Sequence, residues 1–162
     1  MRRALIMSDT HGEGDNLRYL LDDAWKQTGP GPIDHYVHCG DGVNDLVRME
    51  PYILVRDPRA SFHTVRGNCD FMSDEPDFAV FTMEGVRIFV CHGHRYRVKS
   101  GLITLGYAAE EQGCTLALYG HTHIPDMENG RVLMINPGCT QDRRMALLEI
   151  DEGKPHVRLL RL

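Results

Sequence analysis

Short polar segments rich in Asp, Asn and His follow five apolar runs of this chain. The segments are Ser8-Asp9-Thr10-His11-Gly12, Gly40-Asp41, Gly67-Asn68-Cys69-Asp70, His92-Gly93-His94 and Gly120-His121-Thr122-His123. Asp and His are common ligands of borderline divalent metals, and Asn can add a carbonyl oxygen. Seven side chains are therefore candidate metal ligands: Asp9, His11, Asp41, Asn68, His92, His121 and His123.

Each polar segment comes directly after a run that is typical of a buried strand. The runs are Ala4 to Met7, Tyr36 to Cys39, Phe62 to Val65, Ile88 to Cys91 and Leu116 to Tyr119. In open α/β sheets the loops at the carboxyl ends of strands converge on one crevice, where ligands bind. We therefore expect the five segments to meet at one polynuclear metal site.

The number of ligands indicates two ions rather than one. Seven candidates are too many for one ion with an open position, but they suit two ions that share a ligand. Two divalent ions bring about +4, whereas Asp9, Asp41 and a bridging hydroxide bring about −3, so an anionic substrate such as a phosphate ester is favoured. The oxygen and imidazole donors predict manganese first, with nickel, zinc, iron, cobalt or magnesium as alternatives.

The remaining patterns predict an α/β fold. We expect a helix from about Asp15, as N-cap, to Gln27, a helical stretch from Asn44 to Met49, and a helix from about Ser100 to Gln112. Pro51 and Pro58 are expected to break up the segment that follows the second helix. Hairpin turns are expected at Glu84-Gly85, Asn129-Gly130 and Glu152-Gly153. Two packed sheets with helices outside satisfy this pattern, and residues 1–162 are expected to form one domain.

Bulk properties exclude some classes of partner. The net charge of −5 gives no general attraction to nucleic acid or to an anionic membrane. Only four apolar residues follow Met1-Arg2-Arg3, too few for a signal peptide or a membrane span, so a cytoplasmic protein is expected. The five cysteines are an odd count, which indicates buried free thiols rather than a disulfide framework.

The motifs Asp9-x-His11, Gly40-Asp41, Gly67-Asn68, His92-Gly93-His94 and Gly120-His121-x-His123, in this order, resemble the calcineurin-like metallophosphoesterase superfamily. The segments Val65 to Asp70, His92 to Tyr96 and Asn136 to Gly138 are similar to the small YfcE-type phosphodiesterases of bacteria and archaea. The resemblance covers residues 4 to about 150.

This resemblance implies a four-layer α/β/β/α sandwich with two mixed β-sheets flanked by helices. It implies one metal ion held by Asp9, His11, Asp41 and His123, and a second held by Asp41, Asn68, His92 and His121. It further implies a bridging hydroxide that attacks phosphorus in line, a small phosphodiester as substrate, and a homo-oligomer.

One position departs from the wider superfamily. Many members carry His after the Gly-Asn pair, in a role assigned to protonating the leaving group, whereas this chain has Cys69. A thiol with a pKa of about 8.5 is a poor substitute for imidazole. We therefore expect weak activity that favours good leaving groups. Asp41, Asn68 and His94 are the catalytic candidates, and Cys69 and Asp70 are expected to support the ligands.

Two alternatives stay open beside a phosphodiesterase. One is a phosphomonoesterase or a nuclease. The other is a non-catalytic scaffold, because the small retromer subunit resembles this fold but lacks part of the ligand set. Four further histidines, His35, His38, His63 and His156, are expected to be structural. The turn Asn136-Pro137-Gly138 is expected near the site.

Overall fold

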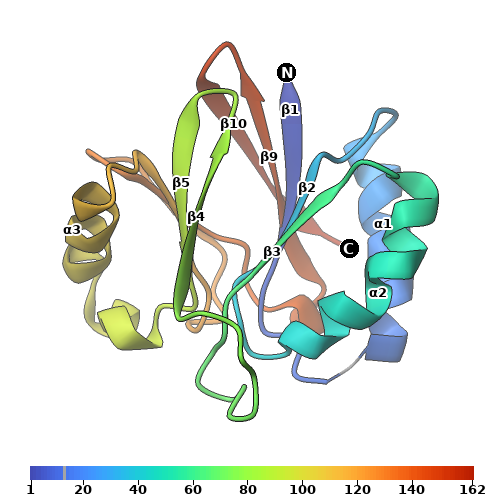
Figure 1. The fold of residues 1–162 in the computed structure, drawn as a ribbon, viewed down its shortest axis with the longest axis horizontal. Helices are drawn as coiled ribbons and strands as arrows, with labels where there is room; N and C mark the ends of the chain where they lie inside the picture. The colour runs from blue at the N-terminus through green and yellow to red at the C-terminus, as the bar shows by residue number, and fades with distance from the viewer. Residues whose placement is uncertain (13) are drawn as a thin grey trace.

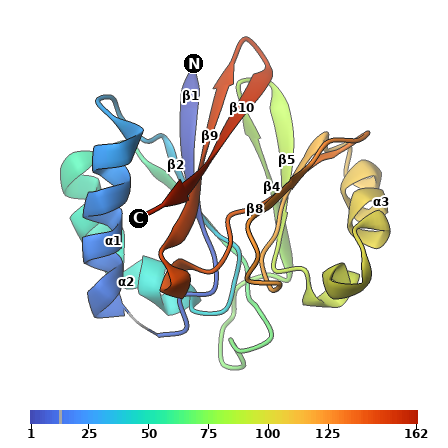
Figure 2. The ribbon, with the colours of Figure 1, turned by 180° about the vertical axis from the view of Figure 1, so that it is seen from behind.

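The computed structural model describes residues 1–12 and 14–162. Two five-stranded sheets lie face to face, with helices α1 (Gly14–Thr28) and α2 (Val43–Arg56) against one sheet and α3 (Ile103–Glu111) against the other (Figure 1). The strands are β1 Arg2–Met7, β2 His35–His38, β3 Ser61–Thr64, β4 Phe78–Met83, β5 Val86–Cys91, β6 Leu116–Leu118, β7 Asp126–Glu128, β8 Leu133–Asn136, β9 Arg144–Asp151 and β10 Lys154–Arg161. Figure 2 shows the same four layers from behind.

Both sheets are mixed. The first has the order β10-β9-β1-β2-β3, in which β1, β2 and β3 run parallel, β9 is antiparallel to β1, and β10 is antiparallel to β9. The second has the order β4-β5-β6-β8-β7, in which β5, β6 and β8 run parallel. The expected α/β/β/α sandwich with two mixed sheets is therefore confirmed.

Three apolar clusters hold the layers together. Between the sheets, Ile6 and Val37 of the first sheet pack with Val90 and Leu118 of the second. A second cluster includes Leu17 and Leu21 of α1, and the third lies under α3, whose Leu105 and Ala109 are buried. Burial of such side chains contributes about 1.5–3 kcal/mol each, so the framework is rigid enough to fix loops at its edge.

The three expected hairpins are present. Glu84-Gly85 and Glu152-Gly153 both have positive φ at each residue, as a two-residue turn between twisted strands requires. The hairpin around Asn129-Gly130 joins β7 to β8 through the longer connection 129–132, and Gly130 is not in the left-handed region.

Three expected boundaries were wrong. Helix α2 continues through Pro51 to Arg56, because buried Leu46 and Ile53 pack on the first sheet and offset the cost of one missing backbone hydrogen bond, about 3 kcal/mol. Asp15 lies in the first turn of α1 rather than at its N-cap, where its charge still favours the helix dipole. Helix α3 starts at Ile103 rather than near Ser100, because Gly101 has a φ of 134°.

The cysteines are all free, as expected, but only four are buried. Cys39, Cys91, Cys114 and Cys139 lie inside, whereas Cys69 is exposed. Within the described residues no helix is both long and apolar enough to cross a bilayer. The loops after β1, β2, β3, β5 and β6 all leave the sheets at the lower end in Figure 1, which brings the five polar segments to one end of the molecule.

Candidate metal centre

Backbone hydrogen bonds join the loops that carry the candidate ligands. The Asp9 amide donates to the Gly40 carbonyl at 2.9 Å, and the His11 amide donates to the Asp41 carbonyl at 3.0 Å. On the second sheet, the Gly120 amide donates to the His92 carbonyl at 3.0 Å. Each loop is therefore positioned by the next one as well as by its own strand.

Five of the seven candidate ligands have left-handed backbone. Asp9, His11, Asp41, His121 and His123 have φ between 50° and 68°. This conformation costs roughly 1–2 kcal/mol for a residue with a Cβ, somewhat less for Asp, and such strain gathers at functional sites. The strain turns side chains toward a common centre that extended backbone would not reach.

Two glycines make the close approach of these loops possible. A Cβ at Gly67 would collide with Oδ1 of Asp41, and a Cβ at Gly120 would collide with Oγ of Ser8. Any larger residue at either position would push a ligand loop away from its neighbour.

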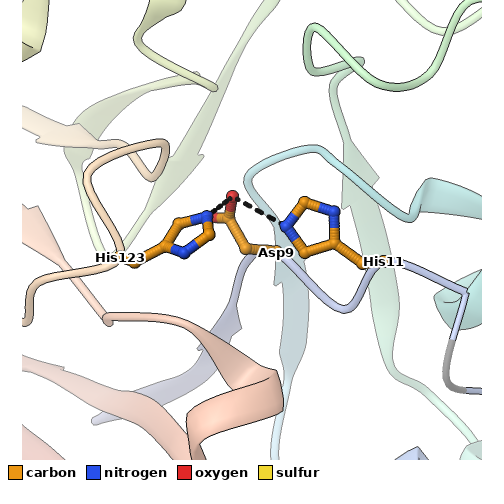
Figure 3. A group of neighbouring side chains, drawn as sticks. All are labelled: Asp9, His11 and His123. Carbon is orange, nitrogen blue, oxygen red and sulfur yellow. Dashed lines mark ion pairs between the residues drawn. The ribbon is translucent and has the colours of Figure 1, made fainter.

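Asp9 is fully buried, yet one of its carboxylate oxygens has no hydrogen bond from any residue in the described ranges 1–12 and 14–162. Its Oδ2 accepts from the Ser8 hydroxyl and, at 3.2 Å, from the His121 amide. Its Oδ1 is 3.0 Å from Nε2 of His123 and 3.6 Å from Nε2 of His11, and Figure 3 shows both rings directed at this oxygen. A buried carboxylate oxygen without a hydrogen bond is costly, so its retention indicates that a cation belongs there.

The second buried carboxylate, Asp41, faces a histidine whose tautomer is fixed. Nδ1 of His92 lies 2.7 Å from the Cys39 carbonyl, so this nitrogen carries the proton and donates. Nε2 of the same ring lies 3.3 Å from Oδ2 of Asp41 and 3.1 Å from Oδ1 of Asn68. A divalent cation among these three atoms would replace a proton on Nε2 and find three ligands.

The pKa shifts follow from the same contacts. Burial raises the pKa of Asp41, but the His92 ring and the Cys69 amide outweigh it and leave this pKa below its usual range. Burial lowers the pKa of His92, yet Asp41 and Asp9 outweigh it and leave the pKa raised. Burial, helped by His92, lowers the pKa of His121 to about 4, so that ring is neutral near pH 7 and able to bind metal.

Among the residues that the structure describes, three groups of donor atoms lie close enough to hold an ion. They are Asp9, His11 and His123; Asp9, Asp41 and His92; and His11, Asp41 and Cys69, each with its atoms within 4.8 Å of one another. His121 belongs to none of these groups, although its ring centroid is 5.0 Å from that of His92. The donor set therefore fits divalent metal ions, with Asp41 and Asp9 each shared between two groups.

Two other predicted residues have different surroundings. The ring centroid of His94 lies 5.4 Å from that of His92, and its buried Nδ1 has no hydrogen-bond partner. Asp70 accepts the backbone amides of Asp41 and Gly42, at 2.7 and 2.8 Å, and that of Gly67 at 2.8 Å. Asp70 thus holds the Asp41 loop through hydrogen bonds.

Two residues belong to the surroundings of the site although sequence patterns indicated them weakly or not at all. Asn136 is fully buried and donates to the Gly120 carbonyl and the Thr122 hydroxyl, both at 3.0 Å, so it positions the loop of His121 and His123. Arg48 of α2 lines a cavity of about 310 Å³ together with His11 and Asp41. An Arg on an amphipathic helix is usually a solvated residue, which is why the sequence did not single it out.

Fold and site together define a class: a two-sheet α/β sandwich with carboxylate and imidazole donors at its strand ends is the arrangement of metallophosphoesterases. Residues 2–153 match the calcineurin-like phosphoesterase superfamily domain, and the chain belongs to that superfamily. This family consists of phosphoesterases that use divalent metals.

Similar proteins support the same assignment. The chain is 35% identical over 148 residues to the probable metallophosphoesterase YsnB of Bacillus subtilis, an alignment that covers 90% of this chain and 79% of that protein. It is 28% identical over 144 residues to phosphodiesterase MJ0936 of Methanocaldococcus jannaschii, with 82% and 81% covered.

Solved structures confirm the fold. A conserved uncharacterized protein of Streptococcus pneumoniae TIGR4, a predicted phosphoesterase, superimposes with a TM-score of 0.75 and 26% identity over 99% of this chain and 89% of the other. A Vps29 single mutant of Entamoeba histolytica gives a TM-score of 0.72 at 18% identity, with 99% of both chains covered. The second likeness shows a shared fold only.

Proposed function

We propose that this chain is a phosphodiesterase with a dinuclear metal centre. Asp9, His11, Asp41 and His123 would hold one ion, and Asp41, Asn68, His92 and His121 would hold the other, with manganese as the first choice. When bound, such ions lower the pKa of coordinated water and neutralise charge on a phosphoryl group. The observation that carries this proposal is the orphaned Oδ1 of Asp9, close to the converging Asp41, His92 and Asn68.

The protein's own residues would mainly position the metal ligands and orient the substrate. The His92 ring is fixed by the Cys39 carbonyl, and the Asp41 carboxylate is fixed by the Cys69 amide at 2.7 Å. Such supporting contacts typically account for 10–100-fold in metal affinity or activity. His94, with a buried nitrogen that has no partner beside His92, would hydrogen-bond the substrate and orient it.

A diester is proposed rather than a monoester for two reasons. The motifs resemble the YfcE-type phosphodiesterases, and the relative MJ0936 is named a phosphodiesterase. The cavity of about 310 Å³ beside His11 and Asp41 accommodates a small phosphate ester of either kind. We propose a small-molecule substrate, because the net charge of −5 gives no broad attraction to nucleic acid.

The test is hydrolysis of bis(p-nitrophenyl) phosphate with Mn²⁺. The wild-type protein should be active, and Asp41→Asn should lose nearly all activity. Asp151→Asn is the matched control, because Asp151 is an exposed aspartate of β9 that pairs with the N-terminus at 3.2 Å. The same assay with p-nitrophenyl phosphate separates diester from monoester preference. Equal rates in wild type and Asp41→Asn, or none in either, would favour the non-catalytic scaffold instead.

A further inference from the structure

The thiol of Cys69 belongs to the third donor group described above, which differs from the other two because it includes a sulfur atom. Sγ of Cys69, a ring nitrogen of His11 and a carboxylate oxygen of Asp41 lie within 4.8 Å of one another. We propose that these three side chains form a position for a thiophilic divalent ion of the zinc, cobalt or cadmium type. The proposal deepens the proposed function, because two of the three ligands also belong to the proposed catalytic pair.

The backbone fixes the thiol where it is needed. The Cys69 amide donates to Oδ1 of Asp41 at 2.7 Å, which places the side chains of both residues on one side of the loop. Nδ2 of Asn68 contacts Sγ of Cys69 at 3.5 Å, so the sulfur lies among polar groups rather than in the apolar core. The Cys69 side chain is thus held toward the centre.

Solvent reaches two of the three donors, while Asp41 is buried. His11, Asp41 and Cys69 line the same cavity of about 310 Å³. The His11 side chain is 25% exposed, and Cys69 is the one exposed cysteine among the described residues. An ion can therefore enter without any opening of the core.

The distances suit zinc after a small adjustment. Zinc binds nitrogen at about 2.0 Å and sulfur at about 2.3 Å in tetrahedral geometry, so two such ligand atoms of one ion lie about 3.5 Å apart. Donors within 4.8 Å of one another therefore need to close by about 1.3 Å at most, and two of the three are on side chains that solvent reaches. Thiolate favours soft and borderline ions, whereas manganese prefers oxygen and nitrogen.

Binding at this position would compete with the proposed catalytic pair. His11 also belongs to the group with Asp9 and His123, so an ion bound to Cys69 draws on a ligand of the proposed catalytic pair. A thiophilic ion would therefore compete with the catalytic ions for His11 and Asp41, whereas manganese would leave Cys69 free. Formation of the sulfur–metal bond breaks the S–H bond, and the proton passes to the buffer.

Cobalt(II) absorption tests the coordination without any catalysis. A thiolate ligand gives a sulfur-to-cobalt charge-transfer band in the near ultraviolet, which carboxylate and imidazole do not give. The wild-type protein should show this band at one equivalent of Co²⁺, and Cys69→Ser should lose it. Cys114→Ser, which removes a buried thiol under α3, should keep it. A band that persists in Cys69→Ser, or a wild-type protein without one, would overturn the proposal.

Alkylation supplies a second measurement. Zn²⁺ should slow the reaction of Cys69 with iodoacetamide at least tenfold, followed by peptide mass analysis, whereas Mn²⁺ should not. Equal protection by both ions, or by neither, would also overturn the proposal. Manganese-dependent hydrolysis is assayed on the same preparation, so failure of the thiol site and failure of the proposed function are told apart.

Discussion

Two groups of histidines differ in what surrounds them: one lies on strands β2 and β3, and the other lies in the loops that follow the strands. Nδ1 of His35, the first residue of β2, lies 3.0 Å from Nε2 of His63 in β3, and the His63 ring stacks on Phe81 at 3.8 Å. No carboxylate of the described residues pairs with either ring. In the loops, His11, His92 and His123 each face a buried aspartate.

The difference shows what distinguishes a structural histidine from a metal ligand. The His35–His63 group satisfies itself, because one ring nitrogen donates to the other and Phe81 covers the ring face. The metal-centre group leaves acceptors unsatisfied, most clearly Oδ1 of Asp9. Histidines alone therefore say little, but histidines beside a buried carboxylate oxygen without a hydrogen bond indicate a cation.

The sharpest test of this comparison is to replace one titratable side chain of each group in turn. Asp9→Asn should reduce manganese-dependent diester hydrolysis by more than about 100-fold, because loss of a ligand exceeds the effect of losing a supporting contact. His63→Phe should leave the rate unchanged. The metal-free Asp9→Asn protein should be no less stable than wild type, since the orphaned oxygen is gone; clear destabilisation in urea unfolding would contradict this interpretation.

Cys69→His, which adds a histidine to the metal-centre group, tests whether the lack of a proton donor for the leaving group limits the rate. Cys69→His should raise the rate on a diester with a poor leaving group by about 100-fold, the lower end of general acid catalysis. The rate on bis(p-nitrophenyl) phosphate should change little, because p-nitrophenolate needs no proton to leave. Unchanged rates on both substrates would show that this position does not limit the reaction.

Bound Mn²⁺ should stabilise the fold through the metal-centre group and not through the His35–His63 pair. Mn²⁺ at 100 times its dissociation constant should add about 2.7 kcal/mol to the free energy of unfolding, because the unfolded chain has no assembled site. Asp9→Asn should lose this increment, whereas His63→Phe should retain it. Thermal unfolding with and without Mn²⁺ measures both, and an equal increment in the two variants would separate metal binding from Asp9.

Lowering the pH should destabilise the fold through the His35–His63 pair. Burial, and then His35, lowers the pKa of His63 to about 4, and burial also lowers the pKa of His35. Between pH 6.5 and about 4 the unfolded chain therefore binds more protons, so stability falls as pH falls. Allowing for partial exposure, His63 should account for about 1–2 kcal/mol of that loss.

The matched measurement is urea unfolding from pH 7 to pH 4 of wild type, His63→Phe and His156→Gln. His63→Phe should flatten the curve, and the exposed His156 should leave it as in wild type. A His63→Phe curve parallel to that of wild type would mean that the pair titrates normally.

The parts of the structure that follow local rules were predictable. Turn signals such as Glu84-Gly85 fixed hairpins, and the rule that parallel strands present their loops at one edge anticipated that the five segments meet. Helix α2 was misjudged at Pro51, because tertiary burial of Ile53 outweighs the local penalty. That residues 1–162 form one domain, and the role of each ligand, stay predictions.

The parts that depend on distant contacts were not predictable. No local pattern shows that Asp9 or His123 adopts a positive φ, since both residue types usually avoid it. The approach of the Cys69 sulfur to His11 depends on how two loops from different strands pack. The orphaned oxygen of Asp9 likewise emerges only when β1 and the loop after β6 come together.

The separation of these ligands along the chain has a kinetic consequence. Asp9 lies near the N-terminus, whereas His123 enters only after β6, on the other sheet. Pairings between such distant segments form slowly, because the chain loses the entropy of closing a long loop before any stabilising contact forms. During synthesis, an ion would thus find no complete coordination shell until most of the polypeptide has emerged and folded. Loading of the proposed metal centre would then be a last step, after the two sheets have come together.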